Sequence, residues 1–155
     1  MLIYLAADHR GFLLKESLKQ HLKNAGYEVA DLGNKEKDES DDYVDFAIAV
    51  AKEVSKDPSF GKGILICGSG VGMDVVANKF RNVRASLCFS PDQAMLARAH
   101  DDANVLVLPA DFLDEEVAKK IVFVWLQTQF DQNPHHQRRL EKLNDLEAKT
   151  LNYFE

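Results

Sequence analysis

The sequence predicts an α/β fold: a three-layer α/β/α sandwich around a five-stranded parallel Rossmann-like sheet, with one extra C-terminal helix. Short apolar runs alternate along the chain with longer amphipathic segments, and most connections between them are short. Glycine, proline or charged residues close most of the apolar runs, as expected for strands that end in turns. Continuous apolar strands are typical of parallel sheets that helices cover on both faces.

The first predicted unit is a strand, a helix and a second strand. Residues 2–7 are almost entirely apolar, and a helical pattern follows over about 11–25. Gly26 is a helix stop, and residues 27–32 form the second predicted strand. The apolar stripe of the helix consists of Leu14, Leu18, Leu22 and Ala25.

The next unit begins after the charged run 35–42, which we interpret as a solvated loop. A helix is predicted over 43–56, because apolar residues recur at helical spacing, and Asp57-Pro58 ends it. The third strand covers 63–67 and the third helix 71–79. The inward positions of the 43–56 helix are Ala47, Val50, Ala51 and Val54.

The last part of the sheet is predicted from two further strands and two helices. Residues 84–89 form the fourth strand, and Ser90-Pro91 begins a helix that runs to Asp101, with proline at the first helical position. Residues 104–108 form the fifth strand, and a helix follows over about 114–129.

Composition limits the possible functions. The 155 residues are enough for one domain, 1–155, in which about 134–155 form a C-terminal helical arm. The net charge of −6 argues against binding to nucleic acid or to an anionic membrane. Two cysteines make no disulfide framework, and no Cys/His group has zinc spacing. With no signal peptide or spanning segment in the sequence, we expect a cytoplasmic protein.

The most informative motif is ILICGSGVG at 64–72, in which a strand ends on Cys67 and opens into three alternating glycines. A helix follows, so backbone amides and a helix N-terminus surround a small volume that suits an anion beside a thiol. The helix N-terminus is expected to lower the pKa of the thiol from its usual value near 8.5. The motif is neither a dinucleotide fingerprint nor a Walker A loop. A purely structural alternative remains open: glycines allow close packing of the helix, and the cysteine is a small buried hydrophobe.

Two other groups of residues could complete a site. Asp8 and His9 follow the first strand, so they lie at the same carboxyl edge of the sheet as Cys67. His100 ends a helix, so it must reach that site by another route, such as a neighbouring subunit. Cys88 also ends a strand but has no glycine loop after it, and we interpret it as a core residue.

The C-terminal arm carries the densest positive cluster of the chain, HHQRR at 135–139. It opens a helix with a leucine stripe, which is either an amphipathic helix with solvated arginines or an anion clamp for the glycine loop. The stripe consists of Leu140, Leu143, Leu146 and Leu151.

Five blocks in the same order resemble the type B ribose-5-phosphate isomerases, a group that includes the related allose- and galactose-6-phosphate isomerases. They are DHRGF at 8–12, ILICGSGVG at 64–72, ANK at 77–79, RAHDDANVL at 98–106 and HQRR at 136–139. The resemblance implies a cofactor-free aldose–ketose isomerase without a metal. It also implies a homodimer or homotetramer whose active sites are shared between subunits.

The resemblance also implies roles for individual residues. Cys67 would be the base that moves a proton between C1 and C2 of the open-chain sugar through a cis-enediolate. His100 would open the sugar ring, and Ser69 would belong to the catalytic loop. The remaining substrate-binding positions are Asp8, His9, Tyr43, Gly68, Gly70, Val71, Gly72, Asp101, His135 and Arg139.

Three positions depart from the family pattern. Asp101 replaces an asparagine, and Asp111 and His135 stand where two phosphate-binding arginines are expected, so Asp111 would reverse the local charge. Ribose 5-phosphate is the expected substrate. The alternatives are allose or galactose 6-phosphate, an unphosphorylated sugar, or a non-catalytic subunit that binds sugar phosphates.

Overall fold

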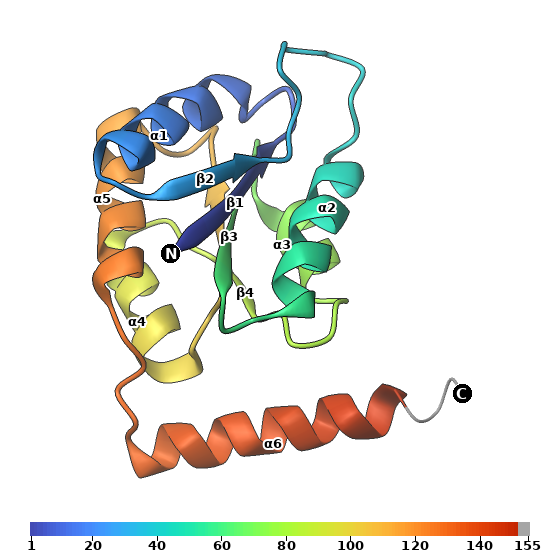
Figure 1. Cartoon of the computed structure of the whole chain (residues 1–155), viewed down its shortest axis with the longest axis vertical. Coiled ribbons are helices and arrows are strands. Elements are labelled where there is room, and N and C mark those ends of the chain that lie inside the picture. The colour runs from blue at the N-terminus through green and yellow to red at the C-terminus, as the bar shows by residue number, and fades with distance from the viewer. Residues whose placement is uncertain (152–155) are drawn as a thin grey trace.

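The computed structural model describes residues 1–151, and five parallel strands form one sheet in the order β2-β1-β3-β5-β4 (Figure 1). The strands are β1 (Leu2–Ala7), β2 (Glu28–Asp31), β3 (Gly61–Cys67), β4 (Ala85–Leu87) and β5 (Val105–Pro109). The helices are α1 (Phe12–Asn24), α2 (Tyr43–Lys56), α3 (Val71–Ala77), α4 (Pro91–Asp101), α5 (Glu115–Gln127) and α6 (Pro134–Leu151). Residues 152–155 of the predicted arm, and the Leu151 side chain, lie outside the described residues. The predicted fold class is confirmed.

Helices cover both faces of the sheet, with α1, α4 and α5 on one face and α2 and α3 on the other (Figure 1). The side chains of β3 alternate between the two cores: Ile64 and Ile66 join the first, whereas Leu65 and Cys67 join the second. This alternation is the pleat of a strand that is buried on both sides. All these side chains are at most 4% exposed.

The order of the strands creates a switch point between β1 and β3. The chain leaves β1 toward β2 at one edge of the sheet and then crosses to β3 on the other side of β1. In open parallel sheets, ligands bind in the crevice at the carboxyl ends of the two strands where the direction reverses. Asp8 and Cys67 stand at these two ends.

The strand β4 is half as long as predicted from residues 84–89, although the predicted strands and helices of residues 2–129 agree with the structure within two residues at each boundary. It is an edge strand, and the Asn78 side chain occupies its outer edge. Asn78 Oδ1 accepts a hydrogen bond from the Ala85 amide at 2.9 Å, and Nδ2 donates to the Ala85 carbonyl at 3.1 Å. A side chain thus replaces the missing neighbour strand and protects the edge.

The buried face of α1 differs from the predicted stripe. Ala25 caps the end of the helix and is exposed, whereas Lys15 is completely buried. Lys15 Nζ donates to both Asp31 carboxylate oxygens at 3.0 and 2.8 Å and to the Asn34 carbonyl at 2.9 Å. These bonds neutralise the buried cation and fix the chain where it leaves β2.

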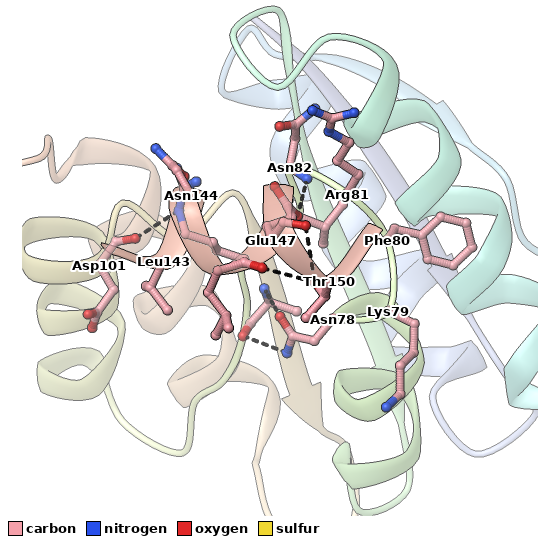
Figure 2. Close-up of a pocket in the computed structure, with 14 residues that line it drawn as sticks. Asn78, Lys79, Phe80, Arg81, Asn82, Asp101, Leu143, Asn144, Glu147 and Thr150 are labelled. Atoms are coloured by element: carbon pink, nitrogen blue, oxygen red, sulfur yellow. Dashed lines mark hydrogen bonds between the residues drawn. The ribbon is translucent and has the colours of Figure 1, made fainter. Parts of the chain in front are cut away.

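Helix α6 lies across the end of the domain where the strands begin (Figure 1). A groove of about 480 Å³ separates it from the α3–β4 connection, and Figure 2 shows Asn82 and Glu147 on facing sides of this groove. Glu147 accepts a hydrogen bond from the Asn82 amide at 2.8 Å. Leu143 and Leu146 remain about half exposed, at 47% and 57%, so the leucine stripe is only partly covered.

Within residues 1–151, the structure contains no helix with the length and apolar character that a bilayer crossing requires.

The buried lysine gives a prediction for stability. Asp31→Ala should lower the free energy of unfolding by roughly 3 kcal/mol, because it leaves the buried Lys15 charge with Glu16, at 2.9 Å, as its one remaining carboxylate partner. Urea unfolding of the double variant Asp31→Ala/Lys15→Met is the control. It should be more stable than Asp31→Ala alone, since the incompletely compensated buried charge is gone. A double variant that is less stable than the single one would contradict this explanation.

Candidate active site

Cys67 is the last residue of β3, and the 68–72 loop turns directly from it into α3. The side chain of Cys67 belongs to the core beneath α2 and α3, and the residue is only 4% exposed. Gly70 caps α3 with a left-handed backbone (φ 78°), and a Cβ there would lie 2.3 Å from Leu87 Cδ1. Glycine is therefore required at 70 both for its conformation and for space. Ser69 and Val71 alternate with the glycines and are exposed at the surface of the loop.

The loop after β1 is fixed against the end of β3. The Asp8 amide donates to the Ile66 carbonyl at 3.2 Å, and the Asp8 carboxylate accepts from the amides of Arg10 and Gly11, both at 3.0 Å. A Cβ at Gly11 would lie 2.5 Å from the Ile66 carbonyl oxygen, so only glycine permits this approach. Burial raises the pKa of the Asp8 carboxyl, and the Gly11 amide partly offsets this effect.

His9 is held by Asp41, a residue that sequence analysis did not select. Asp41 Oδ1 accepts from the His9 amide at 3.0 Å and lies 2.7 Å from His9 Nδ1, while Oδ2 accepts from Asn34 Nδ2 at 3.1 Å. The hydrogen bond to Asp41 raises the pKa of His9 and favours its protonated form. Asp41 lies in the charged run 35–42, where the sequence gives no sign that one carboxylate turns inward to 7% exposure.

Arg10 also lies beside the glycine loop and forms an ion pair with Asp111. Arg10 Nη2 donates to Asp111 Oδ2 at 2.5 Å. A Cβ at Gly68 would lie 2.6 Å from Arg10 Nε and 2.8 Å from Asp111 Oδ2, so the pair packs directly on the loop. Asp111 carries the negative charge expected at this position, and Arg10 offsets part of it. The pair joins residues 101 positions apart, which sequence spacing could not indicate.

Tyr43 reaches the same loop from the start of α2. A Cβ at Gly72 would lie 2.5 Å from Tyr43 Cε2 and 3.0 Å from its hydroxyl oxygen. The ring therefore packs on the backbone of Gly72, while 39% of the residue remains exposed. This contact places the Tyr43 hydroxyl beside the backbone of the 68–72 loop.

The expected lowering of the thiol pKa at Cys67 is wrong for the free protein. Burial is the largest effect and raises the pKa of Cys67, and the negative charges of Asp8 and Asp111 raise it further. The backbone amides of Gly70 and Met73 act in the opposite direction but do not outweigh them. A helix N-terminus favours the thiolate, but removing the sulfur from water costs more here.

The remaining predicted site residues lie at the opposite edge of the sheet. His100 and Asp101 end α4, whose 11 residues make it about 16 Å long. Asp101 lines the groove shown in Figure 2, and His135 and Arg139 belong to the first turns of α6. Among the described residues, none of these four joins the group around Cys67. Within one chain, HHQRR therefore cannot act as a clamp on its own glycine loop.

Comparison with known proteins matches nearly the whole chain. Residues 3–143 fit the model of a family described as ribose/galactose isomerase. The chain is 44% identical to the probable ribose-5-phosphate isomerase B of Mycoplasma genitalium, over 96% of this chain and 97% of that protein. It is 40% identical to ribose-5-phosphate isomerase B of Escherichia coli, over 95% of this chain and 97% of that protein.

Solved structures agree with this result. The crystal structure of the Mycoplasma genitalium enzyme with bound ribulose 5-phosphate superposes with a TM-score of 0.92, at 44% identity, and covers 95% of this chain and 96% of that one. The Clostridium thermocellum ribose-5-phosphate isomerase B gives a TM-score of 0.91 at 37% identity, and covers 97% of this chain and 99% of that one. The chain belongs to the ribose/galactose isomerase family.

Proposed function

We propose that this chain is an aldose–ketose isomerase that interconverts ribose 5-phosphate and ribulose 5-phosphate. The observation that carries the proposal is its close structural match to a relative solved with ribulose 5-phosphate bound. The surroundings of Cys67 suit the chemistry, because they place a potential base beside backbone amides at the switch point of the sheet. The relatives' names favour ribose 5-phosphate over the other sugars that the sequence left open.

In the proposed reaction, the Cys67 thiolate removes the proton from C2 of the open-chain aldose. The electron pair forms the C1–C2 double bond of a cis-enediolate, and the negative charge passes to the C1 oxygen. The proton of the C2 hydroxyl then transfers to the C1 oxygen, so the charge moves to the C2 oxygen. As the C2 oxygen becomes the carbonyl, the Cys67 thiol returns its proton to C1 and becomes a thiolate again. Amides of the 68–72 loop stabilise the negative oxygen of the intermediate. The substrate gains and loses no electrons, so the reaction needs no redox cofactor.

The loop after β1 supplies positive charge to this site. Arg10 packs on Gly68, and Asp41 keeps His9 in a fixed orientation with a raised pKa. Both groups are suited to attract the phosphate or the enediolate of a sugar phosphate. Arg10 thereby offsets the carboxylate at 111, where the family pattern has an arginine.

The role of Cys67 can be tested with the second cysteine as a matched control. Cys67→Ser should reduce turnover of ribose 5-phosphate by about a hundredfold or more, because it removes the base that acts in the transition state. Cys88→Ala should retain most of the activity, since Cys88 is a fully buried core residue outside the site. A coupled assay of ribulose 5-phosphate formation measures both variants. Undiminished turnover in Cys67→Ser would contradict the assignment.

The electrostatics of the thiol predict a dependence on pH. Because the pKa of Cys67 is raised, its alkylation by iodoacetamide should be slow at neutral pH and accelerate only at alkaline pH. Asp111→Asn should shift this acceleration to lower pH, because it removes a negative charge near the sulfur. Arg10→Gln should shift it to higher pH, because Arg10 and the thiolate attract each other. Shifts in the same direction for both variants would contradict this account.

We further propose that a second copy of the chain completes each active site, in a homodimer or homotetramer. The reason is the separation described above: Cys67 lies at the carboxyl edge of the sheet, whereas His100 lies at the end of a helix about 16 Å long. His100, Asp101, His135 and Arg139 of one chain would then serve the glycine loop of another. The residues around Cys67 include the proposed base but not the ring-opening His100. The group at the other edge includes His100 but not the base.

Mixing two inactive variants tests this shared site. Cys67→Ser and His100→Asn should each be inactive on cyclic sugar phosphate, but a mixture that is unfolded and refolded together should regain activity. In a randomly mixed dimer, about one quarter of the sites would contain both native residues. Each variant refolded alone is the control. A mixture that stays as inactive as its components would contradict a site shared between subunits.

The cellular context remains a prediction. We expect the enzyme to act in the cytoplasm on a freely diffusing sugar phosphate, as part of the pentose phosphate pathway. The acidic net charge of −6 is compatible with that setting.

A further inference from the structure

A cluster of two histidines and one aspartate lies at the end of the domain opposite to Cys67. His100 comes from the last turn of α4, Asp131 from the α5–α6 connection and His136 from the first turn of α6. Their potential ligand atoms all lie within 4.8 Å of one another. His136 Nδ1 is 2.9 and 3.0 Å from the two Asp131 carboxylate oxygens, and the rings of His100 and His136 lie 4.1 Å apart between centroids.

Hydrogen bonds donated by backbone amides hold the three segments together, and the Asp131 carboxylate accepts one of them. The Asp131 amide donates to the carbonyl of Ala99, which directly precedes His100, at 3.0 Å. The Asn133 amide donates to Asp131 Oδ1 at 2.9 Å, and the Asn133 side chain accepts from the His135 amide at the start of α6. The positions of the cluster's side chains are therefore largely fixed before any ligand arrives.

The chemistry of the three side chains points to a metal of the zinc class. Imidazole nitrogens with one carboxylate are preferred ligands of Zn²⁺, Co²⁺, Ni²⁺ and Cu²⁺, whereas Mg²⁺ and Ca²⁺ prefer oxygen ligands alone. At a metal–ligand distance near 2.0–2.1 Å, ligand atoms around a tetrahedral ion are about 3.3 Å apart. Small rotations of side chains that already lie within 4.8 Å would reach this spacing.

The charges of the cluster also suit a cation. The carboxylate of Asp131 lies 2.9 Å from His136 Nδ1, and the half-buried rings of His100 and His136 lie 4.1 Å apart between centroids. A divalent ion between these groups would be attracted to the negative carboxylate and to the lone pairs of both rings.

We propose that His100, Asp131 and His136 form a binding site for a divalent transition metal of the zinc class. Three protein ligands leave at least one position open for water, which is typical of accessible rather than purely structural sites. When the metal is bound, His100 can no longer exchange protons with a sugar, so occupancy inhibits isomerisation reversibly. Only this inhibition rests on the proposed function; metal binding itself does not.

Metal binding can be measured without reference to catalysis. Isothermal titration of the chelator-treated full chain with Zn²⁺ should show one site per chain, and Co²⁺ should give visible absorption bands of low coordination number. Mg²⁺ should give neither signal. The titrations are carried out with Cys67→Ser/Cys88→Ala protein, so that a thiol cannot supply the ligand.

Single substitutions locate the site. His136→Gln and Asp131→Asn should each weaken Zn²⁺ binding by about tenfold or more. His135→Gln is the matched control, because this neighbouring histidine lies in the same turn but outside the cluster, and its affinity should be unchanged. Circular dichroism verifies that each variant is folded. No saturable Zn²⁺ binding, or equal affinity in His136→Gln and His135→Gln, would overturn the proposal.

Inhibition is tested separately in the native-cysteine enzyme. Zn²⁺ should inhibit turnover, EDTA should reverse the inhibition, and His136→Gln should require at least about tenfold more Zn²⁺ for the same relative inhibition. A protein that binds Zn²⁺ at the cluster but has no isomerase activity would contradict only the proposed function. An active isomerase that binds no Zn²⁺ would contradict only the metal site.

Discussion

The pairing of β1 with β3 is the constraint on which the site depends. These parallel neighbours run in register from Leu2 and Gly61 to Ala7 and Ile66, so the residues that follow them emerge together at one edge. The contact is tightened where the Asp8 amide bonds to the Ile66 carbonyl and Gly11 leaves no room for a side chain. Because β1 and β3 are paired, the residues that follow them lie close together. These are Asp8, His9 and Arg10 after β1 and the Cys67 thiol at the end of β3.

The charges around Cys67 have opposing effects on its thiolate. Cys67 is buried next to carboxylates that disfavour its thiolate, while backbone amides and Arg10 favour it. The raised pKa favours the protonated thiol in the free protein, and a thiol is alkylated and oxidised more slowly than a thiolate. The ion pair between Arg10 and Asp111 keeps a cation beside the glycine loop in a chain with a net charge of −6.

The two edges of the sheet carry different groups of residues. The carboxyl edge holds the proposed base and its amide cradle, whereas the other edge holds His100, the basic start of α6 and the histidine–aspartate cluster. An α-helix between two parallel strands always returns the chain to the amino edge, so a residue at its end cannot reach the carboxyl edge of its own domain. The proposed division of one active site between copies of the chain would bring these two groups of residues together.

The sequence by itself determined the fold class, the strands and helices of residues 2–129 to within two residues, and the grouping of Asp8, His9 and the glycine loop at one edge. Apolar periodicity and turn residues act locally, and right-handed crossovers put the carboxyl ends of parallel strands at one edge, so these features can be predicted from the chain. Only the tertiary structure decided the pairs His9–Asp41, Lys15–Asp31 and Arg10–Asp111, because each joins segments whose charges look solvated in sequence. It also decided the pKa of Cys67, since the desolvation of a thiol depends on everything packed around it.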